Sequence, residues 1–438
     1  MLFTQFVDDD LGCASYLVGC ERCAEAVVVD PAYAIEQYLE EAERREVRIV
    51  RVLETHTHAD HVSGHGRFAL EHGVPVSIHS LAEPAYPFEP LADGDEIDVG
   101  NVRLGVIHTP GHRPEHCCFT VTDLTRGDEP WLLLTGDSLF VGDAARPDLA
   151  VEAHEGAEGL FHSLHRLLEL SDGVEVYPGH VAGSLCGKGM SSKGSTTIGF
   201  ERRFNPAFAL ATVEQFVADS AAIAAPRPPN MGLIVELNRG PFLGAPAPVP
   251  RLDATDVAVL DARPFDRFAA GHLPGAVNVP VDGHSFATKA GFVVASPFAV
   301  HAPSEEEAGR ALRGLRSVGF LEIEGVLVDP VAGATETIEP VTLDELEQLL
   351  ADGEVEVVDV REQDERDELP LPGSRHVPYR VAGQSDLPAD LSFVTVCETG
   401  VRAEVAASVM AAHGLDARPL VGAGVHELAA TQVSRSTS

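Results

Sequence analysis

The sequence predicts a multidomain α/β protein, and three features support this prediction. Short β-rich runs alternate with turn residues and amphipathic helices through the first 240 residues. A stretch rich in proline and glycine follows at residues 239–252. Beyond it, a pattern of buried strand, helical turn and second strand occurs twice, about one hundred residues apart. We therefore expect three domains, at residues 1–240, 253–332 and 338–438, which fits roughly 150 residues per domain in a chain of 438.

The expected strands of the first domain are short and apolar, and they occupy residues 15–19, 26–31, 47–56, 74–80, 102–112, 131–137 and 174–180. Several end in a histidine or an aspartate beside glycine or another polar residue. Loops at strand ends are where a rigid sheet presents chemical groups. Apolar residues at helical spacing predict helices at 155–170 and 206–225, and a threonine cap opens an expected helix within residues 337–353.

The chain is strongly acidic, with 68 aspartates and glutamates against 31 lysines and arginines, a net charge of −37. Only Lys188, Lys193 and Lys289 are lysines. Such a surface repels nucleic acid and anionic membranes, so we expect neither as a partner. Two interpretations are open: a halophilic protein that works in concentrated salt, where self-repulsion is screened, or an acidic protein from an ordinary cell.

Cysteine usage and hydropathy predict a soluble, cytoplasmic protein. The seven cysteines are odd in number and scattered, unlike a disulfide framework. The N-terminus lacks a basic segment, and no apolar run approaches the ~18 residues that a membrane helix needs. Cys20 and Cys23 form a single CxxC, which we interpret as turn residues because no second pair accompanies it.

Seven side chains that can bind metal stand at the ends of expected strands. They are His56, His58, Asp60 and His61 in the run THTHADH, then His112, Asp137 and His180. Histidine and carboxylate ligands of this kind suit zinc or iron. Any one of these residues alone has an ordinary structural explanation, whereas seven together predict a metal site.

These motifs, in this order, resemble the metallo-β-lactamase superfamily, which implies an αββα sandwich with metal at the edge of its sheets. Two branches of it are compatible with the ligand inventory. Resemblance to the persulfide dioxygenase branch implies one Fe(II) held by His56, His112 and Asp137, with His58, Asp60, His61 and His180 around them. Resemblance to the glyoxalase II branch implies two zinc ions held by all seven residues and hydrolysis of a thioester.

Two further segments favour the persulfide dioxygenase branch. Arg146, in VGDAARPDLA, resembles the arginine that this family places beside its substrate. Residues 177–206 are similar to persulfide dioxygenases fused to rhodanese. Cys186 lies in this stretch, where a free thiol could carry sulfur or bind substrate; the alternative is a small buried residue.

The second copy of the repeat contains a candidate nucleophile, Cys397, at the end of a β-branched strand. A loop of six residues, closed by Arg402, leads from it directly into a helix. Main-chain N–H groups and the positive end of the helix dipole would stabilise a thiolate or a persulfide there. This loop resembles the active loop of rhodaneses, and Asp359 and Arg361 resemble another of the family's motifs. The usual GHIPGA appears only as LPLPGSRH, so the wall on the substrate side is expected to differ.

The first copy of the repeat has no cysteine, because none occurs between Cys186 and Cys397. Ala302 aligns with the nucleophile and is followed by Glu305, Glu306 and Glu307, whose charges would repel a persulfide anion. We therefore expect a degenerate rhodanese-like domain at 253–332 and a catalytic rhodanese domain at 338–438.

The fusion itself favours one pathway, because a persulfide dioxygenase makes sulfite and a rhodanese can use sulfite to make thiosulfate. The resemblance thus implies a thiol persulfide, O2 and sulfite as the small-molecule partners, and we expect a homo-oligomer, either a dimer or a tetramer. The alternatives are a dinuclear zinc thioester hydrolase fused to a sulfurtransferase and a non-catalytic sulfur-carrier scaffold. Which thiol carries the persulfide is left open.

Overall fold

The computed structural model describes the chain except residues 146–152, 182–190, 192, 222–226 and 437–438. It forms two compact units, the first made of residues 1–246 with 316–319, the second of residues 247–315 and 320–438. The boundary at residue 246 falls within the proline-rich stretch 239–252. Both units mix helices and strands, so the predicted α/β class is confirmed.

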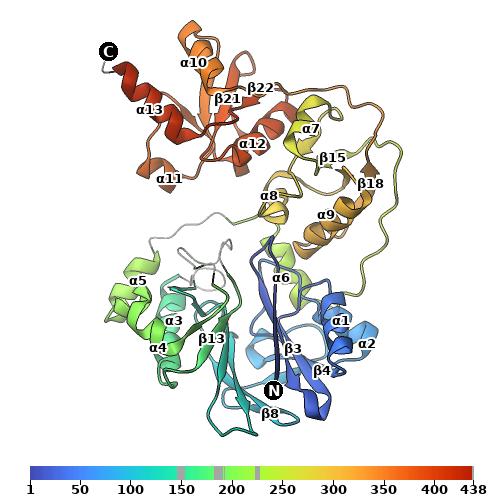
Figure 1. Cartoon of the computed structure of the whole chain (residues 1–438), viewed down its shortest axis with the longest axis vertical. Coiled ribbons are helices and arrows are strands. Elements are labelled where there is room, and N and C mark those ends of the chain that lie inside the picture. Colours follow the sequence, from blue (N-terminus) through green and yellow to red (C-terminus); the bar gives the residue numbers. More distant parts are fainter. Residues whose placement is uncertain (146–152, 182–190, 192, 222–226, 437–438) are drawn as a thin grey trace. The chain divides into compact units, whose positions relative to one another are not determined.

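The first sheet of the first unit has six strands in sequence order: β1 (Leu2–Val7), β2 (Ala14–Cys20), β3 (Glu25–Val29), β4 (Arg48–Leu53), β5 (Val76–His79) and β6 (Glu89–Leu91). Figure 1 shows β3 and β4 of this sheet side by side. Strands β1 to β3 are antiparallel, and β3 to β6 are parallel. Helices α1 (Glu36–Arg44) and α2 (His65–His72) pack on its outer face, where Leu17 and Val28 share a core with Tyr38 and Phe68.

The second sheet has the order β14-β13-β10-β9-β8-β7. Its strands are β7 (Glu96–Val99), β8 (Val102–His108), β9 (Cys117–Asp123), β10 (Leu132–Gly136), β13 (Glu175–Pro178) and β14 (Thr196–Thr197), and a small hairpin of β11 (Leu139–Phe140) and β12 (Asp143–Ala144) follows β10. Helices α3 (Ala153–Leu167), α4 (Ile198–Phe204) and α5 (Val213–Ala221) cover its outer face.

The two sheets face each other across a shared core. Alternate residues of β2, Tyr16 and Val18, point inward and pack with Leu104, Phe119 and Val121 of the second sheet, whereas Leu17 points to the helices outside. Successive side chains of a strand point to opposite faces, so one strand serves both layers. The predicted αββα sandwich is therefore confirmed.

The second unit contains two four-stranded parallel sheets of identical topology. The first has the order β16-β15-β17-β18, from β15 (Ala258–Asp261), β16 (Val277–Asn278), β17 (Phe298–Ala302) and β18 (Ile323–Val328). The second has the order β20-β19-β21-β22, from β19 (Glu356–Asp359), β20 (Arg375–His376), β21 (Ser392–Val396) and β22 (Asp416–Pro419). Equal strand order in the two halves confirms the internal repeat.

Seven helices accompany these sheets in the described part of the second unit. They are α7 (Phe265–Ala270), α8 (Phe286–Val293), α9 (Glu305–Ser317), of which the last two residues group with the first unit, α10 (Leu343–Asp352), α11 (Gln363–Glu368), α12 (Val401–Ala412) and α13 (Val425–Ser436). The expected threonine cap is present as a capping box, in which Thr342 and Glu345 each bond the other's main chain.

The continuous helix predicted at 206–225 was wrong. Pro206–Ala209 form a 3-10 turn, η3, which Asn205 caps, and Leu210 is extended. The helix α5 starts afresh after Thr212, whose hydroxyl accepts a hydrogen bond from Gln215 N–H, and its last described residue is Ala221. Side-chain capping at two points outcompetes the apolar periodicity. A helix that was not predicted, α6 (Met231–Arg239), follows.

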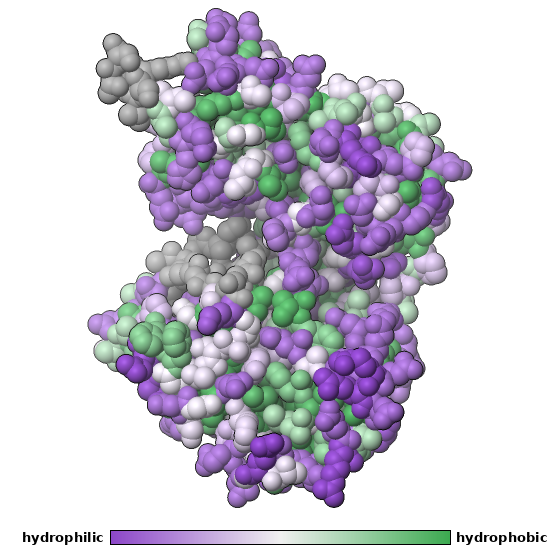
Figure 2. Space-filling model, in the orientation of Figure 1, coloured by the Kyte–Doolittle hydropathy of each residue, from purple (hydrophilic) through white to green (hydrophobic). Residues whose placement is uncertain are grey.

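Hydrophilic residues cover much of each unit on the face drawn in Figure 2, with hydrophobic residues scattered among them. Within the described residues, no helix has both the length and the apolar character needed to cross a bilayer.

Candidate metal centre

Four strand ends deliver the predicted ligands to one edge of the sandwich. His56 follows β4, His112 lies in the loop after β8, Asp137 directly follows β10, and His180 follows β13. All four side chains are buried, with exposed fractions of 1–2%. Because β10 pairs with β13 in parallel, Asp137 and His180 emerge side by side.

His56, His112 and Asp137 form a compact triangle. One nitrogen or oxygen from each lies within 4.8 Å of the other two, and His112 Nε2 is 3.6 Å from Asp137 Oδ2. His56 Nε2 and Asp137 Oδ2 have no hydrogen-bond partner among the described residues. Burying an unsatisfied acceptor costs about 1–3 kcal/mol, which a bound cation would offset. The triangle therefore fits a metal ion bound by two histidines and one carboxylate.

A relay of hydrogen bonds orients the His56 ring. Asp30 accepts hydrogen bonds from Thr55 N–H, at 2.7 Å, and from the Thr55 hydroxyl, at 2.8 Å. Because the Thr55 hydroxyl donates its proton to Asp30, Thr55 Oγ1 accepts a hydrogen bond from His56 Nδ1–H at 2.9 Å. This arrangement leaves the lone pair of His56 Nε2 facing the triangle. The main chain of Asp30 adopts the left-handed conformation, at a φ of +52°.

His116 fixes the main chain at Asp137 and was not predicted. Asp137 N–H donates to His116 Nε2 at 3.0 Å, while His116 Nδ1 lies 2.8 Å from the Thr109 hydroxyl. Burial, followed by the charge of His112, lowers the pKa of His116 to about 3, so it is a neutral acceptor. Gly136, at a φ of +46°, leaves room for this contact, because a Cβ there would lie 2.7 Å from His116 Nε2. The histidine four residues after His112 was the available signal in the sequence.

His180 connects the triangle to a neighbouring group. Its Nδ1 is 2.7 Å from Asp137 Oδ1, and its Nε2 is 2.6 Å from Asp60 Oδ2. Burial would raise the pKa of Asp137, but His180 outweighs it and lowers the value to about 2. Asp137 is thus an anion whose Oδ1 is held by His180 while Oδ2 faces the triangle.

His58 directs one ring nitrogen, Nε2, at two buried carboxylates. Its Nε2 lies 3.1 Å from Glu54 Oε2 and 3.3 Å from Asp30 Oδ1, in a fully buried cluster. Burial alone would lower the pKa of His58, but Asp30 and Glu54 outweigh it and hold the pKa well above its usual range. His58 Nδ1 has no hydrogen bond among the described residues.

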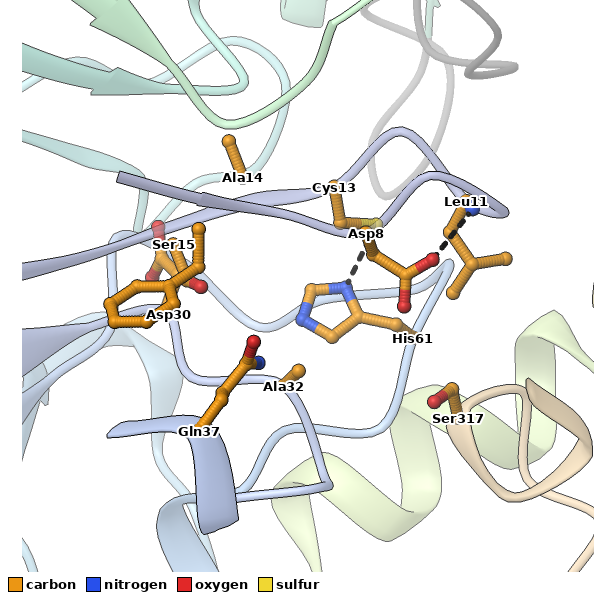
Figure 3. Close-up of a pocket in the computed structure, with 11 residues that line it drawn as sticks. Asp8, Leu11, Cys13, Ala14, Ser15, Asp30, Ala32, Gln37, His61 and Ser317 are labelled. Carbon is orange, nitrogen blue, oxygen red and sulfur yellow. Dashed lines mark hydrogen bonds between the residues drawn. The ribbon is translucent and has the colours of Figure 1, made fainter. Parts of the chain in front are cut away.

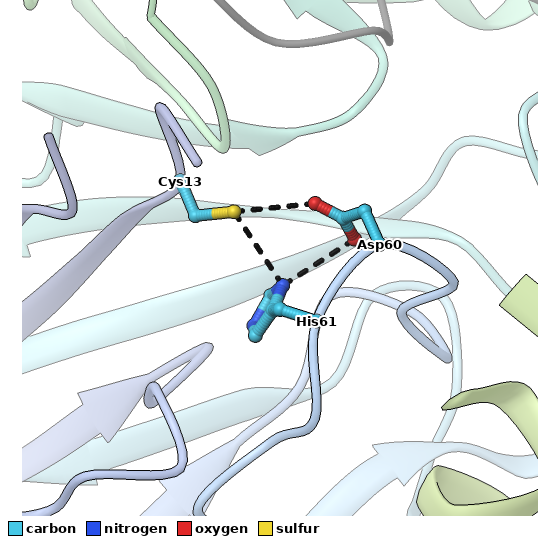
Figure 4. A group of neighbouring side chains, drawn as sticks. All are labelled: Cys13, Asp60 and His61. Atoms are coloured by element: carbon cyan, nitrogen blue, oxygen red, sulfur yellow. Dashed lines mark hydrogen bonds and ion pairs between the residues drawn. The ribbon is translucent and has the colours of Figure 1, made fainter. Parts of the chain in front are cut away.

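Cys13, which the sequence analysis did not single out, lies beside Asp60 and His61. Its Sγ is 3.2 Å from Asp60 Oδ2 and 3.7 Å from His61 Nδ1 (Figure 4). His180 Nε2 lies 3.3 Å from the same sulfur. A bridge between the main chains of Cys13 and His180 fixes this approach. A cavity of about 20 Å³ opens next to the cluster, and Figure 3 shows Cys13 and His61 facing each other in its wall. The four groups are donors that a second cation could use.

Asn238 anchors the loop that carries the histidines and was also not predicted. It lies on α6, is 4% exposed, and accepts a hydrogen bond from Ser63 N–H at 2.9 Å. Its side-chain amide donates to His58 O at 3.0 Å and to His61 O at 2.8 Å. Two further predicted residues, Arg146 and Cys186, lie outside the described residues.

The predicted nucleophile of the second unit lies at the start of α12. Cys397 is 2% exposed, and Gly400 N–H donates to its Sγ at 3.2 Å. Arg402, predicted to close this loop, interacts electrostatically with Cys397 and makes a double hydrogen bond to Glu365 of α11, at 2.5 and 2.6 Å. Gly424 packs on the loop so closely that a Cβ there would lie on Glu398 O. The motif VGAGVHEL thus shapes the main chain around Cys397.

The register of the two repeats identifies the counterpart of Cys397. Asp261 pairs with His301 in the first copy, and Asp359 pairs with Val396 in the second, which places Ala302 at the position of Cys397. The buried pair of Asp359 and Arg361, 2.8 Å apart, likewise has a counterpart in the pair of Asp261 and Arg263, 2.6 Å apart.

Comparison with known proteins agrees with both units. Residues 8–180 match the family model of the metallo-beta-lactamase superfamily, and residues 250–307 and 342–427 match that of the rhodanese-like domain. An uncharacterized protein of Mycobacterium tuberculosis is 31% identical over 232 residues, which cover 47% of this chain and 97% of that protein. The mitochondrial persulfide dioxygenase of Bos taurus is 29% identical over 233 residues, which cover 51% of this chain and 82% of that protein. The structure of a metallo-beta-lactamase from Staphylococcus aureus is similar with a TM-score of 0.69 and 29% identity, covering 75% of this chain and 98% of that one.

Proposed function

Because this chain belongs to the metallo-β-lactamase superfamily and carries rhodanese-like domains, we propose that it oxidises a low-molecular-weight thiol persulfide with O2 at a single Fe(II). In the same proposal, the C-terminal rhodanese domain transfers sulfane sulfur to the sulfite product and releases thiosulfate. The observation that carries this proposal is the buried triangle of His56, His112 and Asp137, in which His56 Nε2 and Asp137 Oδ2 have no hydrogen-bond partner among the described residues. Relatedness to a persulfide dioxygenase supports it.

The triangle would hold the iron and leave further coordination positions for substrate sulfur and O2. An Fe(II) ion bound there would supply the redox chemistry of oxygen activation. The protein's part is orientation: Thr55 fixes the His56 ring, and His180 fixes one oxygen of Asp137 so that the other faces the ion. Arg146 is proposed to bind the substrate, and Cys186 to carry sulfur or bind substrate.

The second step needs a thiolate that accepts and releases sulfane sulfur. Cys397 would attack the outer sulfur of a persulfide, RSSH, to give the Cys397 persulfide and RSH. Sulfite would then attack that outer sulfur, forming thiosulfate and returning the Cys397 thiolate. Gly400 N–H, at the N-terminus of α12, donates to the sulfur and would stabilise the anion in both forms. If Arg402 left Glu365 and paired with the incoming sulfite, it would place a cation beside an anionic substrate.

Substitution of one ligand tests the proposal directly. We expect one iron per chain in the wild type, and loss of both iron and oxygen uptake in His112→Ala. Thiosulfate:cyanide sulfur transfer should persist, because Cys397 belongs to the other unit. His162→Ala, on the exposed face of α3, is the matched control. Oxygen uptake that survives in His112→Ala would contradict the ligand assignment, and a panel of persulfides in the same assay would identify the thiol.

A dinuclear zinc thioester hydrolase is the second candidate, and one observation favours it. Cys13, Asp60 and His61 each offer a donor atom within 4.8 Å of the others, beside His180. Two zinc ions per chain, together with thioester hydrolysis and no oxygen uptake, would establish this alternative in place of the first.

A further inference from the structure

Cys20 and Cys23 lie in direct contact at the edge of the first unit. Cys20 is the last residue of β2 and is 4% exposed, whereas Cys23 ends the 3-10 turn η1 (Glu21–Cys23) and is exposed to solvent. Their Sγ atoms are 2.7 Å apart. The Cys23 thiol is therefore accessible to a small reagent, whereas the Cys20 thiol is buried behind it.

The main chain around the pair is built to hold the two sulfurs together. Ala24 adopts the left-handed conformation, at a φ of +56°, and closes the turn with a hydrogen bond to Glu21 O at 3.1 Å. Gly100, at a φ of +61°, leaves the space that the thiols fill. A Cβ on Gly100 would lie 2.4 Å from Cys23 Sγ and 2.9 Å from Cys20 Cβ. Any larger residue at position 100 would push the pair apart.

The two thiols differ in acidity, and the buried Cys20 is the more acidic of the two. Burial would raise the pKa of Cys20, but hydrogen bonds from Cys23 and from the Asn101 main chain outweigh it and lower the pKa. The hydrogen bond with Cys20 raises the pKa of Cys23. By contrast, burial raises the pKa of Cys118, inside the sandwich, to about 12, which leaves that thiol unreactive.

We propose that Cys20 and Cys23 form a redox-active dithiol that small molecules containing a sulfur–sulfur bond oxidise to a disulfide. With a disulfide RSSR, Cys23 is the thiol that the reagent can reach. It loses its proton, attacks one sulfur and expels RS⁻, giving a mixed disulfide. The Cys20 thiolate then attacks Cys23 Sγ, forms the Cys20–Cys23 bond and expels the second RS⁻. The two thiol protons leave on the two RSH molecules, and two electrons pass from the protein to RSSR.

A persulfide RSSH can drive the same reaction. Cys23 attacks the outer sulfur and takes it as a Cys23 persulfide, releasing RSH. Cys20 then attacks Cys23 Sγ and expels hydrogen sulfide. The site does not depend on the metal chemistry proposed above, because β2 has seven residues and spans roughly 20 Å, with Ala14 beside the metal centre at its other end.

The test is made on the full-length protein with excess glutathione disulfide in one arm and glutathione persulfide in the other. Free thiols are then blocked, and the peptide holding both cysteines is analysed by mass spectrometry. We expect an internal disulfide, seen as a peptide lighter by two hydrogen atoms, with glutathione released and, in the persulfide arm, sulfide. Oxidation in one arm alone identifies the oxidant and supports the proposal.

Two variants separate this chemistry from ordinary thiol modification. Cys20→Ser should trap a stable mixed disulfide on Cys23 in the disulfide arm, and Cys23→Ser should leave Cys20 unmodified. Fluorescence of Trp131, in the same unit, checks that each variant is folded. The proposal is overturned if both wild-type thiols stay free in both arms. It is equally overturned if wild-type Cys23 keeps its mixed disulfide as Cys20→Ser does.

Discussion

Replacement of Asn238 should weaken the metal-binding loop in a way that depends on which atom is removed. Its carboxamide makes three buried hydrogen bonds to main-chain groups at Ser63, His58 and His61, more than 170 positions earlier in the chain. Each such bond contributes about 1 kcal/mol net, and an abandoned buried partner adds to the loss. We therefore expect Asn238→Ala to lower the free energy of unfolding of the first unit by about 3 kcal/mol.

Asn238→Asp makes the prediction sharper because it keeps the shape of the side chain. The oxygen that accepts from Ser63 N–H survives, but the donor to His58 O and His61 O becomes an anionic oxygen facing two carbonyl oxygens. We expect this variant to be at least as unstable as Asn238→Ala. Iron affinity should fall by about tenfold in both, as for other residues that hold metal ligands in place. Glu236→Ala, exposed on the same helix, is the control.

Urea unfolding followed by tryptophan fluorescence measures this effect in one unit. Trp131 is the only tryptophan of the chain and lies in the first unit. With a denaturant dependence near 3 kcal/mol per molar, a loss of about 3 kcal/mol moves the midpoint by roughly 1 M. A midpoint in Asn238→Asp equal to that of the wild type would refute the reasoning, because the amide could not then be donating to both carbonyls.

Three further outcomes are expected. With Cys397→Ser, persulfide should still consume oxygen, but sulfite should accumulate in place of thiosulfate; an unchanged thiosulfate yield, measured by chromatography, would contradict this. The melting temperature should rise steeply between 0.01 M and 1 M salt, because a net charge of −37 repels itself across a Debye length that falls from about 30 to about 3 Å; a flat profile would exclude halophilic adaptation. Burial, with Asp266 nearby, raises the pKa of Glu404 from 4.5 to about 7, so the folded state binds a proton more tightly and stability is lost as pH rises from 4.5 to about 7. The free energy of unfolding of Glu404→Gln, measured by calorimetry, should equal that of the wild type at pH 5 and exceed it by about 1 kcal/mol at pH 8. This figure is reduced because the side chain is partly exposed to solvent. Equal free energies of unfolding at pH 8 would refute the assignment.

The parts of the site that the sequence predicted are those fixed by short-range structure. Asp137 directly follows β10 and His56 comes three residues after β4, so each strand places its ligand once its register is known. The same logic placed Cys397 between β21 and α12. In each case the chemistry and the strand that carries it lie within a few residues of each other.

The missed residues reach the site through contacts that no local pattern encodes. Cys13 meets His180 by a bridge across 167 positions, and Asn238 lies on α6, a helix that the sequence analysis did not predict. The partner of Arg402, Glu365 on a separate helix, was likewise not predicted. Contacts of this kind depend on how distant elements pack together. The periodicity and spacing of residues along the sequence give no information about that packing.

The contacts of His58 bear on how many ligands the centre has. Its Nε2 lies 3.1 Å from Glu54 and 3.3 Å from Asp30, whereas its buried Nδ1 has no hydrogen bond among the described residues. A metal ion could bind Nδ1 while Nε2–H continues to donate to the carboxylates, because a buried carboxylate commonly orients a ligating histidine in this way. His58 therefore fits both the centre of three ligands and the centre of two metals, and the metal content per chain distinguishes them.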